Sequence, residues 1–348
     1  MLRRLIPRRL TPTSEIDRLL IVRTDELGDV ILTLPLAAAV KKRRPDIDLG
    51  FLVSAGIAHI VDRIVEIDRT FTLPEKGGAL PIYRDFHPDA VIFAHPDLKL
   101  IRQAARAKID VRVGPGYRWY SSLLTRWVYD RRSRGGSHEA EFELNMLEPL
   151  FEGPYDIELP ELPVMAEAAE EARTHRADLG IGDRYGIIHP IGKPGLPDYP
   201  IAKYVEVAQR LLADHPDLSL IVTAGKGERA TAEKLVAGVD APGRIAVSDS
   251  LSPNGVSELL REAAFFLASA SDGAHLAGLV GTPVVALFSG APPDWPQRRR
   301  PLGNNITTLV PDRNEPVPDD ESHVENPERV VARIAVERVV SAVSGMLG

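Results

Sequence analysis

The stretch from Leu19 to Pro35, LLIVRTDELGDVILTLP, joins two apolar runs through a short turn that carries three carboxylates. Leu19 to Val22 predicts a buried strand that ends at Arg23, and the second apolar run predicts a helix packed on a sheet. The acidic residues of the turn are Asp25, Glu26 and Asp29, placed around Gly28. In α/β enzymes the chemistry lies where strands of a parallel sheet end in such loops. This stretch therefore predicts an α/β fold with a functional site at the turn.

Strand and helix patterns alternate along both halves of the chain. In the first half, strands are predicted at 19–23, 48–53, 90–94 and 110–113, and helices at 30–43, 56–65, 97–107 and 138–150. In the second half, strands are predicted at 185–189, 218–223, 264–268 and 283–288, and helices at 164–178, 200–213, 227–238, 254–262, 273–280 and 327–346. Such alternation favours parallel sheets covered by helices on both faces. We therefore expect two Rossmann-like parallel-sheet domains that face a cleft.

The domain limits follow from length and from a proline-punctuated stretch. A chain of 348 residues with 44% apolar residues suggests two domains with ample cores. The segment FEGPYDIELPELP at 151–163 has little periodicity and predicts a linker. We expect an N-terminal acceptor-binding domain at 1–155 and a C-terminal donor-binding domain at 156–325. The remaining helix, 326–348, is expected to pack back on the N-terminal domain.

Composition excludes several classes of site. The absence of cysteine excludes disulfides, thiolate metal sites and cysteine nucleophiles, and it suits a reducing compartment. No apolar run approaches the ~20 residues that span a bilayer, and the basic N-terminus lacks the apolar core of a signal peptide. We therefore expect a cytoplasmic protein, with weak peripheral contact to the inner face of the cytoplasmic membrane.

Positive charge is concentrated in one region of an acidic chain. Between Lys99 and Arg134 there are ten Lys or Arg residues against Asp110 and Asp130, a local charge of +8 in a chain of net charge −7. Scattered charges are usually a solvated surface, with the tryptophans among them in the core. The functional alternative is a site for an anionic lipid-linked or glycan acceptor, and the overall pI of about 5.8 disfavours nucleic acid. The residues predicted to bind such an acceptor are Arg118, Arg126, Arg131 and Arg132.

The order of residues in the first turn resembles the N-terminal signature of the family 9 glycosyltransferases, the lipopolysaccharide heptosyltransferases and their relatives. The matching residues are Arg23, Gly28-Asp29-Val30 and Leu34-Pro35. The resemblance implies that Asp29 is the catalytic base. The alternative from position alone is that Asp29 only caps the helix that follows. One of its two acidic neighbours, Asp25 or Glu26, is an alternative candidate for the role of base.

Further motifs extend the resemblance over most of residues 19–290. The strand at 185–189 is followed by a Gly-rich loop and Tyr199-Pro200, which takes the place of the family's Trp-Pro. The family's phosphate-binding lysine falls on Pro197, and Lys193 either replaces it or is only an exposed loop lysine. Near the middle of the second half, VTAGKGE places Gly225 and Glu228 where the family holds the ribose.

The strongest C-terminal match is SASDGAHLAGLVGTPVVALF, at 269–288. It keeps the His-Leu-Ala and Gly-Thr-Pro elements of the family, with His275 placed to donate to a phosphate oxygen. Asp272 lies only three residues before His275, whereas the family's Asp lies five before it, at the place of Ala270. A weaker match, SHEAEFELNMLEPL at 137–150, also predicts a helix capped by Ser137.

Together the resemblance implies a GT-B-like fold and an inverting transferase that moves a sugar, heptose first, from a nucleotide-diphosphate donor to a lipopolysaccharide-core or related glycan hydroxyl. The donor site it implies consists of Lys193, Gly225, Glu228, Leu251, Asp272, Gly273 and His275. It requires neither a metal nor a cofactor besides the ADP-sugar substrate. One alternative is a non-catalytic nucleotide-sugar- or glycan-binding protein derived from such a transferase. A nucleotide-sugar epimerase would need a different set of carboxylates.

Overall fold

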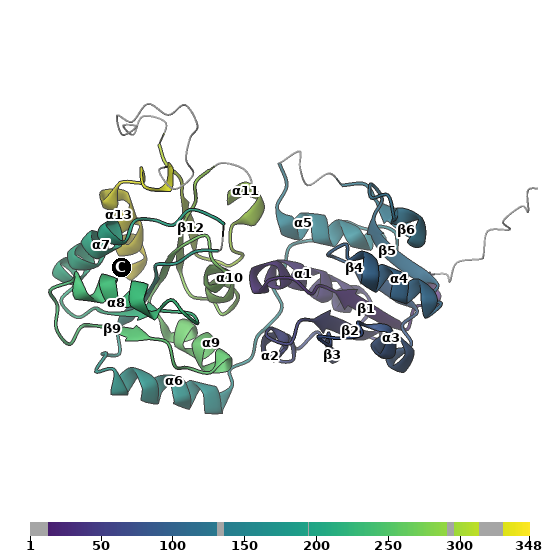
Figure 1. Ribbon diagram of the computed structural model, residues 1–348, viewed down its shortest axis with the longest axis horizontal. Helices are drawn as coiled ribbons and strands as arrows, with labels where there is room; N and C mark the ends of the chain where they lie inside the picture. The colour runs from purple at the N-terminus through teal and green to yellow at the C-terminus, as the bar shows by residue number, and fades with distance from the viewer. Residues whose placement is uncertain (1–12, 131–135, 194, 291–295, 313–329) are drawn as a thin grey trace, which may run out of the picture. The chain divides into compact units, whose positions relative to one another are not determined.

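The computed structural model describes residues 13–130, 136–193, 195–290, 296–312 and 330–348. The chain divides into two compact units, Met1–Glu161 and Leu162–Gly348. The first unit is drawn in purple to blue in Figure 1, and the second in teal to yellow. Each unit is built around its own parallel sheet.

In the described part of the first unit, six strands form a sheet in the order β3-β2-β1-β4-β5-β6. The strands are β1 (Arg18–Val22), β2 (Asp48–Val53), β3 (Arg69–Thr72), β4 (Ala90–Phe93), β5 (Val111–Pro115) and β6 (Arg126–Val128). All neighbouring pairs are parallel; Leu20, for example, is in register with Gly50 on one side and Val91 on the other. The chain enters at β1, builds outward to β3, and returns to β4 on the other side of β1. The carboxyl ends of β1 and β4 therefore lie side by side where the strand order reverses, which is where open α/β sheets bind ligands.

Helices cover this sheet. They are α1 (Leu27–Arg43), α2 (Ala58–Val61), α3 (Leu80–Phe86), α4 (Leu98–Arg106) and α5 (Glu139–Leu144), with short 3₁₀ turns η1 (Thr13–Glu15), η2 (Ser121–Leu123) and η4 (Asn145–Leu147). The long helix α1 is apolar and is buried almost continuously from Gly28 to Ala37, because it lies between the sheet and α5.

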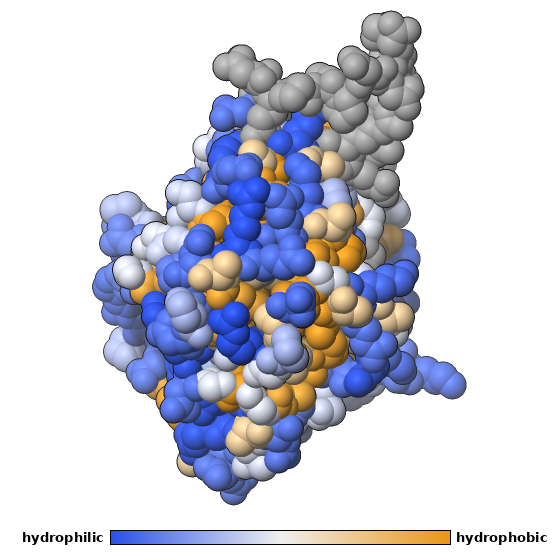
Figure 2. All heavy atoms as spheres, turned by 90° about the vertical axis from the view of Figure 1, so that its left-hand side faces the viewer, coloured by the Kyte–Doolittle hydropathy of each residue, from blue (hydrophilic) through white to orange (hydrophobic). Residues whose placement is uncertain are grey.

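The second unit repeats this plan. Within its described residues the sheet order is β12-β11-β10-β7-β8-β9, so β7 and β10 meet at the reversal as β1 and β4 do. The strands are β7 (Tyr185–His189), β8 (Ser219–Thr223), β9 (Ile245–Ser248), β10 (Phe266–Ser269), β11 (Val284–Leu287) and β12 (Ile306–Leu309). The helices are α6 (Ala166–Asp178), α7 (Ile201–Asp214), α8 (Arg229–Ala237), α9 (Pro253–Glu262), α10 (Asp272–Leu279), α11 (Pro296–Arg299) and α13 (Val336–Leu347). On the side of this unit that Figure 2 shows, hydrophilic and hydrophobic residues are interspersed.

The two doubly wound sheets confirm the predicted α/β class with two Rossmann-like domains. The unit boundary lies between Glu161 and Leu162, six residues after the expected limit of 155. The helix α13 packs on α7 and β11 of the second unit, and the expected return of the C-terminal helix to the N-terminal domain stays a prediction. Val336, Val339 and Val343 of α13 complete the core of that unit. The predicted start of this helix, 327–329, lies outside the described residues.

Candidate active site

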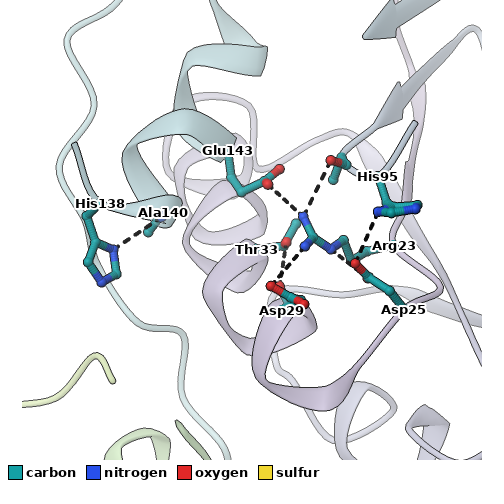
Figure 3. Close-up of polar contacts among 9 residues, drawn as sticks. Arg23, Asp25, Asp29, Thr33, His95, His138, Ala140 and Glu143 are labelled. Atoms are coloured by element: carbon teal, nitrogen blue, oxygen red, sulfur yellow. Dashed lines mark hydrogen bonds and ion pairs between the residues drawn. The ribbon is translucent and has the colours of Figure 1, made fainter. Parts of the chain in front are cut away.

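Arg23 is the centre of a buried charge cluster in the first unit. It follows directly after β1 and is only 2% exposed, and its backbone N–H donates to Leu52 O. Its guanidinium contacts three carboxylates: Nε donates to Asp25 Oδ1 at 2.7 Å, Nη1 to Glu143 Oε1 at 2.7 Å, and Nη2 lies 3.2 Å from Asp29 Oδ1. Figure 3 shows the carboxylates converging on the guanidinium from the turn, α1 and α5. A buried guanidinium requires such partners, and here it fixes the positions of three acids at once.

The electrostatics of the cluster keep Arg23 and Asp25 ionised. Burial lowers the pKa of Arg23, but the carboxylates of Glu143, Asp25 and Asp29 outweigh this effect and raise it above its usual range. For Asp25, burial raises the pKa, and the hydrogen bonds and charges of His95 and Arg23 prevail and lower it to about 2. Asp25 is therefore a carboxylate across the physiological range and serves as a hydrogen-bond acceptor.

Asp29 lies in the first turn of α1, three residues after Glu26, which holds the N-cap position. The alternative that Asp29 only caps this helix is wrong, because its side chain is paired with Arg23. Its backbone carbonyl accepts the hydroxyl of Thr33 at 2.9 Å. The helix N-terminus also favours a negative charge at this position. Asp29 is thus a carboxylate in a fixed position at the point where the strand order reverses.

His95 is a second polar group at this point, and the sequence reasoning missed it. It follows β4 by two residues, and 48% of its side chain is exposed, against 8% for Asp29. Its Nδ1 lies 3.2 Å from Asp25 Oδ2, and because a carboxylate only accepts, the imidazole donates there. A histidine directly after a predicted buried strand was the available signal, since that position marks the carboxyl edge of a parallel sheet.

The helix α5 contributes the third carboxylate, Glu143, whose side chain is fully buried. The predicted cap of this helix, Ser137, is wrong by one residue. His138 is the N-cap: its Nδ1 accepts from Ala140 N at 3.2 Å, and the side chain of Glu141 accepts from the N–H of His138 at 3.0 Å. This reciprocal capping starts α5 one residue later and directs Glu143 towards Arg23 (Figure 3).

In the second unit, the predicted donor residues all follow the carboxyl ends of parallel strands. They are Lys193 after β7, Gly225 and Glu228 after β8, Leu251 after β9, and Asp272, Gly273 and His275 after β10. The topology therefore brings them to one edge of the sheet. Asp272 and His275 are three positions apart on α10 and share a face of that helix.

His189, at the end of β7, is the second residue that sequence reasoning left unassigned as a site residue. Its Nδ1 donates to the backbone oxygen of Thr223 at 3.1 Å, and its ring stacks on Phe266 with centroids 6.4 Å apart. A Cβ at Gly273 would lie 3.0 Å from the Phe266 ring, so the glycine lets α10 approach it. Burial lowers the pKa of His189, against the opposing charges of Glu228, Asp198 and Asp272. The ring is therefore neutral, with Nδ1 protonated and Nε2 as its acceptor.

Hydrogen bonds and close contacts fix the conformation of the loop after β7. Asp198 Oδ1 accepts from Gly192 N at 2.6 Å, and a Cβ at Gly192 would lie 2.9 Å from Ala270 O. The backbone N–H of Lys193 donates to the same Ala270 O at 2.8 Å. Tyr199, in the place of the family's tryptophan, is fully buried, and its N–H donates to Ser269 Oγ at 2.9 Å. The loop is thereby held against the end of β10.

Glu228 folds back on its own turn. Its Oε2 accepts from Gly225 N at 2.6 Å, and a Cβ at Gly225 would lie 2.8 Å from that oxygen. The structure therefore explains the glycine before this acid by close contact. The role of Glu228 towards a ribose stays a prediction.

The predicted acceptor residues lie in two settings. Arg118 is exposed, with its guanidinium over the ring of Tyr117 at 5.5 Å. Arg126, on β6, is half-buried and donates to Pro149 O at 2.5 Å, and burial lowers its pKa. Arg131 and Arg132 lie outside the described residues. The alternative that the tryptophans of this region are core residues is wrong, because Trp119 and Trp127 are exposed.

Among the described residues, no cluster of three or more His, Cys, Asp or Glu side chains is arranged to hold a metal ion. Within the same ranges, every helix is too short or too polar to cross a bilayer.

Comparison with known proteins identifies the family of this chain and solved structures with a similar fold. The profile of "Glycosyltransferase family 9 (heptosyltransferase)" matches residues 99–327, more than half of the chain. "Lipopolysaccharide heptosyltransferase 3" of Escherichia coli is 22% identical over 347 residues, covering 92% of this chain and 96% of that protein.

Two solved structures are similar over nearly the whole length. The glycosyl transferase family 9 structure from Veillonella parvula has a TM-score of 0.79 at 18% identity, covering 95% of this chain and 97% of that one. The E. coli heptosyltransferase WaaC with ADP has a TM-score of 0.69 at 18% identity, covering 94% and 99%. At these identities the likeness shows the fold.

Proposed function

This chain belongs to glycosyltransferase family 9, and from that premise we propose that it transfers a heptose from ADP-heptose to a hydroxyl of a lipopolysaccharide core or a related glycan, with inversion. Support for the nucleotide comes from the similar fold of WaaC, whose structure was solved with ADP. Support for the acceptor class comes from the relation to E. coli lipopolysaccharide heptosyltransferase 3. The observation that carries the proposal is the Arg23-centred carboxylate cluster at the reversal of the first sheet.

In the proposed reaction, the acceptor hydroxyl attacks the anomeric carbon and gives its proton to the carboxylate of Asp29. The new bond joins the acceptor oxygen to that carbon, and the bond to the diphosphate breaks with its electron pair leaving on the phosphate oxygen. Arg23 is the positioning residue: it holds Asp29 through Oδ1 and is itself held by Glu143. General-base assistance of this kind typically contributes about 10²–10⁴ in rate.

We place the donor at the carboxyl edge of the second sheet, on Lys193, Gly225, Glu228, Leu251, Asp272, Gly273 and His275. Negative charge develops on the departing diphosphate. Backbone N–H groups at the start of α10 and the side chains of Lys193 and His275 would stabilise it. Asp272 follows Ser271, the N-cap of α10, so its contribution would be to the sugar or ribose hydroxyls rather than to phosphate.

We place the acceptor on the first unit, where its anionic groups would meet Arg118, Arg126, Arg131 and Arg132. The deciding experiment measures ADP release and product mass with ADP-heptose and a lipopolysaccharide-core acceptor. The expected result is stoichiometric ADP and a product heavier by one heptose, with little turnover in Asp29→Asn. Donor binding without turnover in the wild-type protein, with several core acceptors, would instead favour the non-catalytic binding protein.

A further inference from the structure

The segment 117–129 of the first unit exposes aromatic side chains. Trp119 is 78% exposed, Tyr129 69%, Trp127 47% and Tyr117 43%, and every exposed Phe, Tyr or Trp side chain found among the described residues belongs to this segment. Large aromatic groups are normally buried, so a cluster of exposed ones marks an interaction surface. We call these four side chains the aromatic patch.

The aromatic patch is held in place by hydrogen bonds. Trp127 Nε1 donates to Ser121 O at 2.8 Å, and Trp119 packs edge-on against Tyr120 with centroids 5.5 Å apart. The hydroxyl of Tyr120 donates to Pro96 O at 2.9 Å, which fixes this segment next to the end of β4. The indoles are therefore presented by a fixed backbone, and their exposure is built into the fold.

Positive charge borders the aromatic patch. The exposed residues Lys99, Arg102 and Arg106 recur along α4, opposite the buried Leu100, Ile101 and Ala104. Helix α4 packs against η2 and β5, directly beside the aromatic segment. Arg118 lies within the segment itself, over Tyr117. Aromatic rings among cations are the combination that binds the headgroup region of an anionic bilayer.

The position of the patch suits a protein that works on a membrane-embedded substrate. Residues 116–120 follow the carboxyl end of β5, and Tyr129 follows that of β6, so the patch lies at the same sheet edge as Arg23 and His95. At about 4.8 Å per strand, β6 is roughly 10 Å from β4 along that edge. A headgroup-level contact there would leave the site at the membrane surface.

We propose that the aromatic patch and the basic face of α4 dock the first unit on an anionic phospholipid bilayer. The proposal rests on the proposed function in one respect only: docking would bring the site to a lipid-linked acceptor. Vesicle binding itself needs neither donor nor acceptor. A bilayer is favoured over a glycan because the cations lie along a helix surface beside the rings, which matches an extended anionic plane.

The test is flotation of the full-length protein with vesicles of phosphatidylglycerol and phosphatidylcholine, at low and physiological salt. One variant removes aromatic surface (Trp119→Ser with Tyr129→Ser), and another removes charge (Lys99→Ser, Arg102→Ser and Arg106→Ser). The control is Lys76→Ser with Arg84→Ser, two exposed cations of the same unit outside the patch. Circular dichroism and thermal unfolding establish that each variant is folded.

We expect binding of the wild-type protein that requires phosphatidylglycerol and weakens with salt. Loss of three cations should lower partitioning about a hundredfold, since each is worth about fivefold near an anionic surface. The aromatic variant should bind more weakly at both salt concentrations, and the control should bind normally. Brominated lipids should quench tryptophan fluorescence less in Trp119→Phe and Trp127→Phe.

Patch variants that float like the wild-type protein would overturn the proposal. Displacement from vesicles by a soluble core oligosaccharide would also overturn it and identify a glycan platform instead. The Asp29→Asn protein should float normally, so a failure of the catalytic proposal would leave this result unchanged.

Discussion

Nδ1 of His95 lies 3.2 Å from Oδ2 of Asp25, the carboxylate whose other oxygen accepts from Arg23. This pairing orients an exposed imidazole in the same charge cluster as the more buried Asp29. The site therefore contains two groups able to accept a proton, Asp29 and His95. Arg23 contacts Asp29 directly and is linked to His95 through Asp25. The variants Asp29→Asn and His95→Gln distinguish the two groups.

Asp29→Asn should lower kcat about 10²–10⁴-fold and leave donor affinity unchanged, because the amide keeps the size of the side chain and cannot take the proton. Steady-state kinetics with saturating donor, together with calorimetry using ADP, measure the two effects. Turnover within threefold of the wild-type value would exclude Asp29 as the base.

His95→Gln should lower kcat less than tenfold if Asp29 is the base, since glutamine can still donate to Asp25. The informative measurement is the pH dependence of kcat for the wild type, His95→Gln and Asp29→Asn. If His95→Gln loses as much rate as Asp29→Asn and also loses a limb of the profile, the His95–Asp25 pair is the base instead.

Asp25 should make stability depend on acid pH. Its pKa falls from 3.8 to about 2 on folding, so it stabilises the fold at pH values above its unfolded pKa, and this contribution is lost as the pH drops from about 4 to 2. The full effect is about 2 kcal/mol. Urea unfolding at a series of pH values should show that acidification lowers the free energy of unfolding less in Asp25→Asn than in the wild-type protein. Parallel curves for the two proteins would contradict this account.

Glu143→Ala should destabilise the first unit by about 3–5 kcal/mol, because it leaves Arg23 buried without one of its carboxylates. The matched control is Glu158→Ala. Glu158 pairs with Lys42 at the surface, half exposed, where solvent screening leaves such a pair with little effect on stability. Chemical denaturation measures both, and equal losses in the two variants would argue against a structural role for the buried pair.

ADP should bind the second unit in the presence of EDTA, and His275→Ala should weaken binding about tenfold, as expected for one hydrogen bond to a charged group. Lys234→Ala, an exposed lysine on α8, is the control. Calorimetry gives the affinities. Binding that disappears with EDTA would point to a metal-dependent donor site.

The class and most central elements could be predicted because their residues carry strong local patterns. β1, β2, β7 and β8 are short apolar runs buried on both faces, and helix α1 follows from one continuous apolar segment. The short outer strands β3, β6, β9 and β12 were missed. They are three or four residues long, with partly exposed positions, so pairing with a neighbouring strand rather than local pattern defines them.

The position of Asp29 in the first turn after β1 could be predicted because a local motif carries it. The link from Arg23 to Glu143 spans 120 residues and exists only after α5 packs on α1. The His95–Asp25 contact depends in the same way on β4 lying beside β1. Such contacts are products of topology, which periodicity does not encode.

The same long link constrains the order of events during synthesis. β1 emerges from the ribosome first, but Glu143 follows Arg23 by 120 residues. At typical elongation rates of about 5–20 residues per second, this interval is roughly 6–24 s. Throughout it the central strand carries a guanidinium destined for the interior without one of its partners. The nascent first unit therefore lacks this contact until α5 is made, and a chain that stops short of α5 should be less stable than the complete unit.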